Sequence, residues 1–266
     1  MSVRRESRAL DDGYRSALVP GLRSSQDAER LATEIGFSAG RLRSLAEDPP
    51  GLLGEIARTD DREQATWLCL LTVYLSPLHG PDPFVGVRRA ATDWHSGEMP
   101  DLTGVPLGPR TSHDPARGLR TLEAYRHWAL RAGSQGAALG GDPQWSEERR
   151  FERAFERLAL PGLERAGRYD LLVTLGHLKL YGLRADSLHA RGDDDAVAAA
   201  KRVFAIGDPL NLELRARALS DAAEVPIETL DLALANWVSP QRASLGTSAD
   251  GVDEGAADRA AEALGL

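Results

Sequence analysis

The chain has 266 residues, of which 42% are hydrophobic and 27% are charged, and its net charge is −8. This composition is typical of a globular protein and excludes a disordered or fibrous chain. Because Cys69 is the only cysteine, a disulfide framework and a cysteine-rich zinc site are excluded as well.

No segment of the sequence is suited to a membrane. There is no run of about 18 apolar residues, and no apolar segment follows the basic residues near the N-terminus. We therefore expect no membrane partner, no secretory leader and a cytoplasmic location. Lys179 and Lys201 are the only lysines among the 32 basic residues, so amine chemistry has two side-chain candidates.

Helical periodicity runs through the middle of the chain. Residues 61–75 begin with acidic side chains, which suit a helix N-terminus, and continue with nearly uninterrupted apolar residues, which are typical of a buried helix. Residues 144–158 form a second predicted helix, capped by Ser146, and residues 168–180 a third. Since the alternating pattern of a half-buried strand is absent, we predict an all-α fold.

Three segments are predicted to lie outside helices. Residues 79–84 contain two prolines, which a helix interior does not accept, and predict a rigid turn. Residues 97–118 are rich in glycine and proline and predict a long loop, a kind that is usually functional or disordered. Residues 239–255 predict a tail that precedes a short alanine-rich helix.

The C-terminal third predicts two helices joined by a very short turn. Residues 193–195 are suited to cap the first helix, which runs to about Phe204, and Asp208-Pro209 is a favourable opening for the second. The turn at residues 205–207 contains a glycine, so its backbone N–H groups could approach a phosphate closely. Such helix pairs also occur in bundles that bind no DNA, and Asp208 would repel a phosphate, so both interpretations stay open.

Two carboxylates follow this hairpin. Glu228 lies 21 residues after Gly207, and Asp231 lies 24 residues after it. A fixed carboxylate can stabilise the oxocarbenium-like transition state in which an N-glycosidic bond breaks. The alternatives are that Glu228 is an exposed acid in a first turn and that Asp231 is a buried cap or ion-pair partner. Because burying an unpaired acid is costly, we expect Asp231 to have a defined structural or catalytic task.

The sequence resembles the alpha-glutamyl/putrescinyl thymine pyrophosphorylase family, a divergent branch of the helix–hairpin–helix DNA glycosylase superfamily. The stretches that carry the resemblance, in family order, are LSPLHGPDPF (75–84), FERAFERLALPG (151–162), RYDLLVTLGHLKLYGL (168–183), AAKRVFAIGDPL (199–210) and LDLALANW (230–237). It implies an all-α, helix–hairpin–helix glycosylase-like fold in residues 61–238, with the hairpin at about 196–223. The flanking parts are an N-terminal helical segment, 1–60, and a C-terminal tail with a short helix, 239–266.

The resemblance also implies a set of functional residues. Members of the superfamily have a carboxylate after the second hairpin helix, so Asp231 is the first candidate for the catalytic residue and Glu228 the second. The predicted DNA-binding residues of the hairpin are Lys201, Arg202, Ile206 and Gly207. The predicted base pocket consists of Ser76, His79, Asp82, Phe84, Arg168, Tyr169, Asp170 and His177. For His177 a place in the core, and for the turn at 76–84 a plain helix-ending role, stay open as alternatives.

The implied activity is hydrolysis of a bulky modified base, such as glucosylated hydroxymethylcytosine, from double-stranded phage DNA in antiviral defence. Because no lysine lies at the start of the second hairpin helix, we expect a monofunctional enzyme that leaves an abasic site. We expect no cofactor, no metal and no obligate protein partner. Two other functions stay open: a phage-derived thymine hypermodification enzyme of pyrophosphorylase type, and a non-catalytic helical DNA-binding module.

Overall fold

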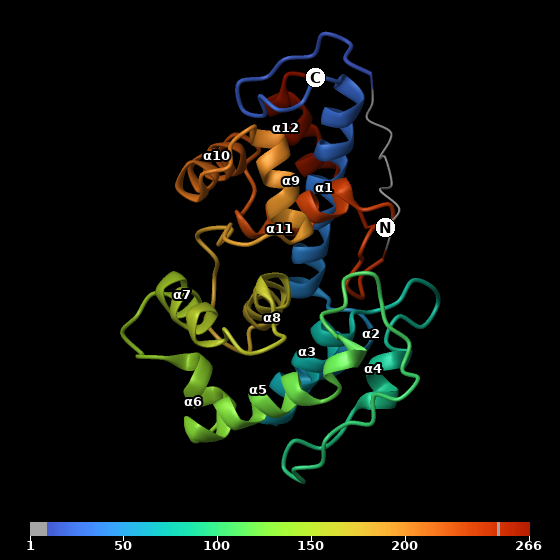
Figure 1. Ribbon diagram of the computed structural model, residues 1–266, viewed down its shortest axis with the longest axis vertical. Helices are drawn as coiled ribbons and strands as arrows, with labels where there is room; N and C mark the ends of the chain where they lie inside the picture. The colour runs from blue at the N-terminus through green and yellow to red at the C-terminus, as the bar shows by residue number, and fades with distance from the viewer. Residues whose placement is uncertain (1–9, 249–250) are drawn as a thin grey trace. The chain divides into compact units, whose positions relative to one another are not determined.

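The computed structural model describes residues 10–248 and 251–266 (Figure 1). Helix accounts for 56% of the structure, and the described residues form no strand, which confirms the predicted all-α class. None of the helices in these ranges combines the length and apolar character that a bilayer span requires. The N-terminal residues 1–9, on which the expectation of no leader depends, lie outside the described ranges.

The chain divides into two compact units. Unit 1 consists of Met1–Ala39, Ser187–Ser239 and Val252–Leu266, and unit 2 consists of Gly40–Asp186 and Pro240–Gly251. Helix α1, Ser25–Glu47, begins in unit 1 and ends in unit 2. The predicted boundaries near residues 60 and 238 stay a prediction.

Unit 1 is built around a helical hairpin and the helix that follows it. Its complete helices are α9 (Asp195–Phe204), α10 (Pro209–Ala222), α11 (Glu228–Val238) and α12 (Glu254–Leu264). Helix α11 packs along α9, while α10 contacts α9, α11 and α12. The side chain of Asp194 caps α9 by accepting hydrogen bonds from the backbone N–H groups of Ala196 and Val197, at 3.1 and 3.2 Å. The two predicted helices and the short turn between them are therefore present, with Asp194 and Asp208 as their caps.

Unit 2 contains the shorter helices and the long loop. Its elements are α2 (Gly51–Arg58), α3 (Arg62–Leu75), α4 (Val85–Ala90), the 3-10 helix η1 (Pro115–Arg117), α5 (Arg120–Arg131), α6 (Gln135–Gly140), α7 (Glu147–Arg157) and α8 (Arg165–His177). Helix α3 is buried along most of its length and packs against α8, α2, α4 and α6. Asp61 caps it by accepting a hydrogen bond from the Gln64 N–H at 3.0 Å. The expectation of a buried helix with an acidic cap is thus confirmed.

The two other predicted helices of unit 2 exist with shifted ends. Helix α7 begins directly after Ser146, whose hydroxyl accepts a hydrogen bond from the Arg149 N–H at 3.3 Å, as predicted. Its buried face includes Phe151 and Phe155. Helix α8 starts and ends three residues earlier than the predicted range 168–180. It ends early because Lys179 adopts a left-handed conformation, with φ of 59°.

The segment after α11 is packed into unit 2 rather than forming a loose tail. Residues 243–247 are buried, and the Phe84 ring lies so close to the backbone of Gly246 that a Cβ atom there would collide with it. Gly246 also has a positive φ of 91°, which glycine adopts at little cost. The expectation of a tail at 239–255 is therefore wrong for residues 243–247, because periodicity does not detect irregular backbone that packs into a core.

Helix α8 ends with Lys179 in the left-handed conformation, at a position where glycine is usual. The Lys179 N–H donates to the Gly176 carbonyl at 2.9 Å and the Leu180 N–H donates to the Leu175 carbonyl at 3.1 Å, which is the Schellman arrangement. Glu224 holds the same place after α10, with φ of 52°. A left-handed conformation costs a side chain with a Cβ roughly 1–2 kcal/mol.

The Lys179→Gly variant should therefore be more stable than the parent protein by about 1 kcal/mol, since relief of the left-handed strain exceeds the extra chain entropy of glycine when unfolded. Chemical denaturation measures the difference. The matched control is Ala198→Gly, at an exposed position inside α9, which should lose about 1 kcal/mol. Destabilisation of both variants by the same amount would contradict the strain at Lys179.

Candidate functional site

The tip of the α9–α10 hairpin is open to a partner. The helix-ending residue in the left-handed region is Ala205, with φ of 53° and ψ of 34°. Gly207 is exposed, its φ is not positive, and a Cβ atom built there would meet nothing within 4 Å. Neither its own backbone conformation nor packing against the chain requires a glycine at this position. The missing side chain leaves room for another molecule to approach the backbone between Ile206 and Asp208.

Lys201 and Arg202, the basic residues predicted to bind DNA near this tip, interact with other residues of unit 1. The Lys201 ammonium donates to the Gly192 carbonyl at 3.1 Å. The Arg202 guanidinium lies 4.7 Å from the centre of the Trp237 ring and 3.9 Å from a carboxylate oxygen of Asp27. Both side chains are half-buried. Contact with a phosphate at the hairpin would therefore depend more on backbone N–H groups than on these two cations.

Asp208 opposes an anion at the start of α10. Its carboxylate accepts a hydrogen bond from the Asn211 N–H at 2.9 Å. The carboxylate thus occupies one of the N–H groups that a phosphate at a helix N-terminus would use. The most accessible backbone for a phosphate is the tip itself, just before this cap.

The two candidate catalytic carboxylates lie in the first turn of α11. Glu228 is 6% exposed and Asp231 is 1% exposed, in a helix whose other buried residues are mostly apolar. The alternative that Glu228 is an exposed acid is therefore wrong. A carboxylate held in a buried helix turn has the chemistry needed to stabilise a developing positive charge.

In unit 2, two of the predicted pocket residues are joined by a residue that the sequence did not single out. Arg110 donates through Nε to Asp170 at 2.6 Å, and its backbone N–H donates to the Ser76 hydroxyl at 3.4 Å. The side chains of Arg110 and Asp170 are 10% and 7% exposed. The carboxylate of Asp170 is thus committed to a buried ion pair that fixes the long loop to α8.

The other predicted residues on the 76–84 turn divide into exposed and buried positions. His79 and Asp82 are exposed, and Asp82 accepts a hydrogen bond from the Phe84 N–H at 3.3 Å. Phe84 itself is 3% exposed and begins α4. The Leu78 N–H donates to the Pro83 carbonyl at 2.9 Å, which closes the turn that the prolines predicted.

Two of the predicted residues of α8, Arg168 and Tyr169, contact α7. Tyr169 is 1% exposed and meets the edge of Phe151, with the ring centres 5.5 Å apart. The Arg168 guanidinium lies 4.3 Å from the centre of the Phe155 ring. Burial and then the nearby charge of Arg165 lower the pKa of Arg168. His177 is half-buried in the last turn of α8.

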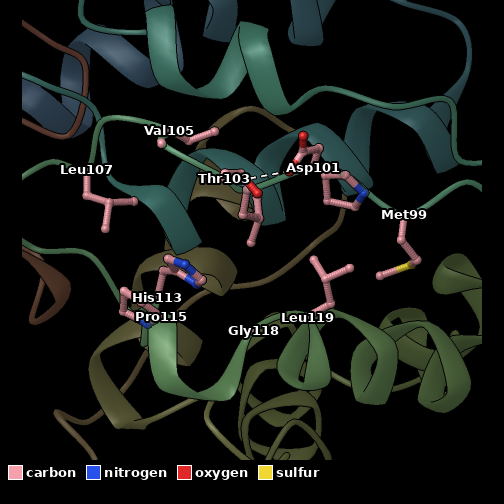
Figure 2. Close-up of a pocket in the computed structure, with 12 residues that line it drawn as sticks. Met99, Asp101, Thr103, Val105, Leu107, His113, Pro115, Gly118 and Leu119 are labelled. Atoms are coloured by element: carbon pink, nitrogen blue, oxygen red, sulfur yellow. Dashed lines mark hydrogen bonds between the residues drawn. The ribbon is translucent and has the colours of Figure 1, made fainter.

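The long loop at residues 97–118 lines an open cavity of about 660 Å³ (Figure 2). It is attached to the end of α3, where the Ser112 N–H donates to the Tyr74 carbonyl at 3.0 Å and the Gly108 N–H donates to the Leu75 carbonyl at 3.1 Å. The sequence identified the loop by its length and glycine–proline content. It did not identify the residues that line the cavity, because they share no motif.

His113 is the imidazole of this cavity. Its Nδ1 lies 3.1 Å from the Tyr74 hydroxyl, and the two rings meet edge to face at 5.3 Å. Burial lowers the pKa of His113, with a smaller opposing effect from the charge of Asp114. The ring is therefore neutral at pH 7.

Within the described residues there is no group of three or more His, Cys, Asp or Glu side chains that could hold a metal ion. Cys69 is fully buried, and burial raises the pKa of its thiol, so a reactive thiolate is disfavoured. Comparison of the chain with models of known families, with curated proteins and with solved structures gives no significant match.

Replacement of Asp170 by Asn should destabilise the protein by about 3 kcal/mol, because it removes the charge of a carboxylate that is paired with Arg110 in a buried site. Chemical denaturation measures this loss. The control is Glu55→Gln, which breaks an ion pair with Arg88 whose side chains are about half exposed and should cost less than about 1 kcal/mol. Similar small losses in both variants would show that the Arg110–Asp170 pair does not hold the loop.

Proposed function

We propose that the protein is a monofunctional DNA glycosylase that hydrolyses the N-glycosidic bond of a bulky modified base in double-stranded DNA. The observation that carries the proposal is the succession in unit 1 of an open hairpin tip, at Ala205–Gly207, and a helix with two buried carboxylates in its first turn. The tip would grip the DNA backbone, and Asp231 would act on the sugar. The resemblance of the sequence to the thymine pyrophosphorylase branch of the glycosylase superfamily supports the same assignment and suggests phage DNA as the substrate.

The chemistry assigns a separate task to each part. When the bond between the sugar and the base breaks, positive charge develops on the sugar, and the Asp231 carboxylate would stabilise it while water attacks. Glu228, one helical turn earlier, would orient that water. No lysine lies near the start of α10, so water rather than a lysine amine would add to the anomeric carbon of the sugar. The N-glycosidic bond would break, the base would leave with a proton, and the sugar would stay in the strand as an abasic site.

The charge of the protein limits how it would hold DNA. A chain with a net charge of −8 does not attract a duplex over its whole surface. Contact would be local, through backbone N–H groups at the tip and a few arginines. The cost of turning a base out of the duplex, a few kcal/mol, then favours bases that already pair or stack poorly or that gain contacts through a bulky substituent.

The activity is tested by base release. Duplex oligonucleotides with cytosine, hydroxymethylcytosine, glucosylated hydroxymethylcytosine or a modified thymine are incubated with the protein, and abasic sites are then cleaved with alkali. We expect breaks at one modified base only, reduced at least about 100-fold in Asp231→Asn because one anionic stabiliser is lost. Circular dichroism verifies that the variant is folded. Breaks that persist in Asp231→Asn and disappear in Glu228→Gln would transfer the catalytic role to Glu228, and folded protein without breaks on any substrate would refute the glycosylase assignment.

The grip on DNA is tested at the tip. Gly207→Val should leave the thermal midpoint nearly unchanged, since a Cβ atom built at this exposed position has open space around it, and should weaken duplex binding about tenfold by blocking backbone approach. The matched control is Gly140→Val, at a position in unit 2 that is equally open and should bind as the parent does. Affinity of the parent should fall steeply between about 50 and 200 mM salt. Equal affinity of parent and Gly207→Val would remove the tip from the interface.

A further inference from the structure

The cavity of the long loop has the size and lining of a small-molecule site. Its volume of about 660 Å³ lies within the range of roughly 300–1,000 Å³ that is typical of ligand pockets. Figure 2 shows two opposing walls: Met99 to Leu107 forms one, and His113 to Leu119 forms the other. Both walls belong to unit 2 and to one continuous stretch of chain.

The lining is mainly apolar. Apart from glycine and proline, its apolar side chains are Met99, Leu102, Val105, Leu107 and Leu119. Leu107 and Leu119 are each partly exposed, so their surfaces face the hollow rather than a filled core. When a ligand removes an apolar surface of this kind from water, the free energy of the complex falls by roughly 25 cal/mol per Å² of buried surface.

Asp101 is the one residue with a formal charge at neutral pH among those that line the cavity. Its carboxylate accepts a hydrogen bond from the Thr103 N–H at 2.9 Å, and this bond, followed by one from the Thr103 hydroxyl, lowers the pKa of Asp101. Asp101 is exposed, and the charge of Arg89 makes a smaller contribution to lowering its pKa. The Arg89 guanidinium donates to the carbonyls of Thr103 and Gly104 at 3.3 and 3.1 Å. Arg89 thus stabilises the turn at Thr103 and Gly104 and is not one of the residues that line the cavity.

His113 does not oppose a cationic ligand. Because burial disfavours its protonated form, the ring that lines the other wall is uncharged, and it can accept or donate one hydrogen bond. The cavity therefore combines apolar walls, one anionic end and one neutral polar group. An anionic ligand would meet repulsion from Asp101 without a compensating cation in the lining.

We propose that this cavity binds a small organic cation: an amine with an apolar body, whose ammonium group faces Asp101 and whose body lies between Leu107 and Leu119. The proposal does not depend on the glycosylase activity, because it concerns a cavity within unit 2 and none of the residues assigned to catalysis. The ligand could be a substrate, an effector or a fragment of a larger molecule, and the shared chemistry in each case is an ammonium on an apolar body.

Three probes with the same body and different charge test the proposal. Tryptamine, tryptophol and indole-3-acetate carry an ammonium, a hydroxyl and a carboxylate on the same indole, and binding to the full chain is measured by calorimetry and by chemical-shift changes. We expect tryptamine to bind about two- to fivefold more tightly than tryptophol and indole-3-acetate to bind most weakly. Equal binding of the three probes, or no binding of tryptamine at millimolar concentration, would overturn the proposal.

Two variants distinguish the cavity from nonspecific binding. Asp101→Asn keeps an oxygen acceptor for the Thr103 N–H and removes the charge, so tryptamine should bind only as tightly as tryptophol. Leu107→Trp fills the cavity and should weaken all probes, whereas Leu130→Trp, at an exposed position of α5, should weaken none. Unchanged tryptamine binding in both Asp101→Asn and Leu107→Trp would place the amine elsewhere and refute the site. Base release by these variants should match the parent, so a failure here leaves the glycosylase proposal intact.

Discussion

The ends of the helices set the main constraint on this structure. Each helix leaves backbone N–H groups without partners at its start, and a chain of short helices has many such ends. The protein satisfies several of them with short acidic or hydroxyl side chains, among them Asp61, Ser146, Asp194 and Asp208. Part of its large acidic content is therefore structural, and the net charge of −8 says less about partners than its magnitude suggests.

This constraint separates two kinds of acid near the hairpin. Asp208 is exposed, precedes its helix and bonds to an N–H group of the first turn, which is the position of an ordinary cap. Glu228 and Asp231 lie inside α11 and are buried, and the residue that precedes this helix, Ile227, has no side-chain oxygen to cap it. Glu228 and Asp231 therefore differ from Asp208 in position and burial, and they are not the cap of the helix that contains them.

Structural features that depend on a few neighbouring residues were predictable from the sequence. The burial of α3, the caps of α7 and α9, and the three-residue turn before Asp208 follow from periodicity and cap chemistry. The left-handed conformations of Ala205 and Lys179 were not predictable, because these residue types disfavour that conformation and only the surrounding packing imposes it. Nor was the Arg110–Asp170 pair, whose members are 60 positions apart and could each pair with many other charges.

In the loop at 97–118, contacts between residues far apart in the sequence fix the conformation of the backbone. Ordering one residue costs roughly 1–2 kcal/mol of backbone entropy, so a loop of this length adopts one conformation only where bonds and burial offset that cost. The bonds of Gly108, Arg110 and Ser112 to the end of α3 and to α8 do so on one side, and those of Arg89 to Thr103 and Gly104 do so on the other. Between these anchors the apolar walls face a hollow and lose the dispersion contacts that close packing would supply. A chain that fixes both walls and leaves the space between them unfilled has already met most of the ordering cost of binding, and a ligand of complementary shape and charge would regain the missing contacts.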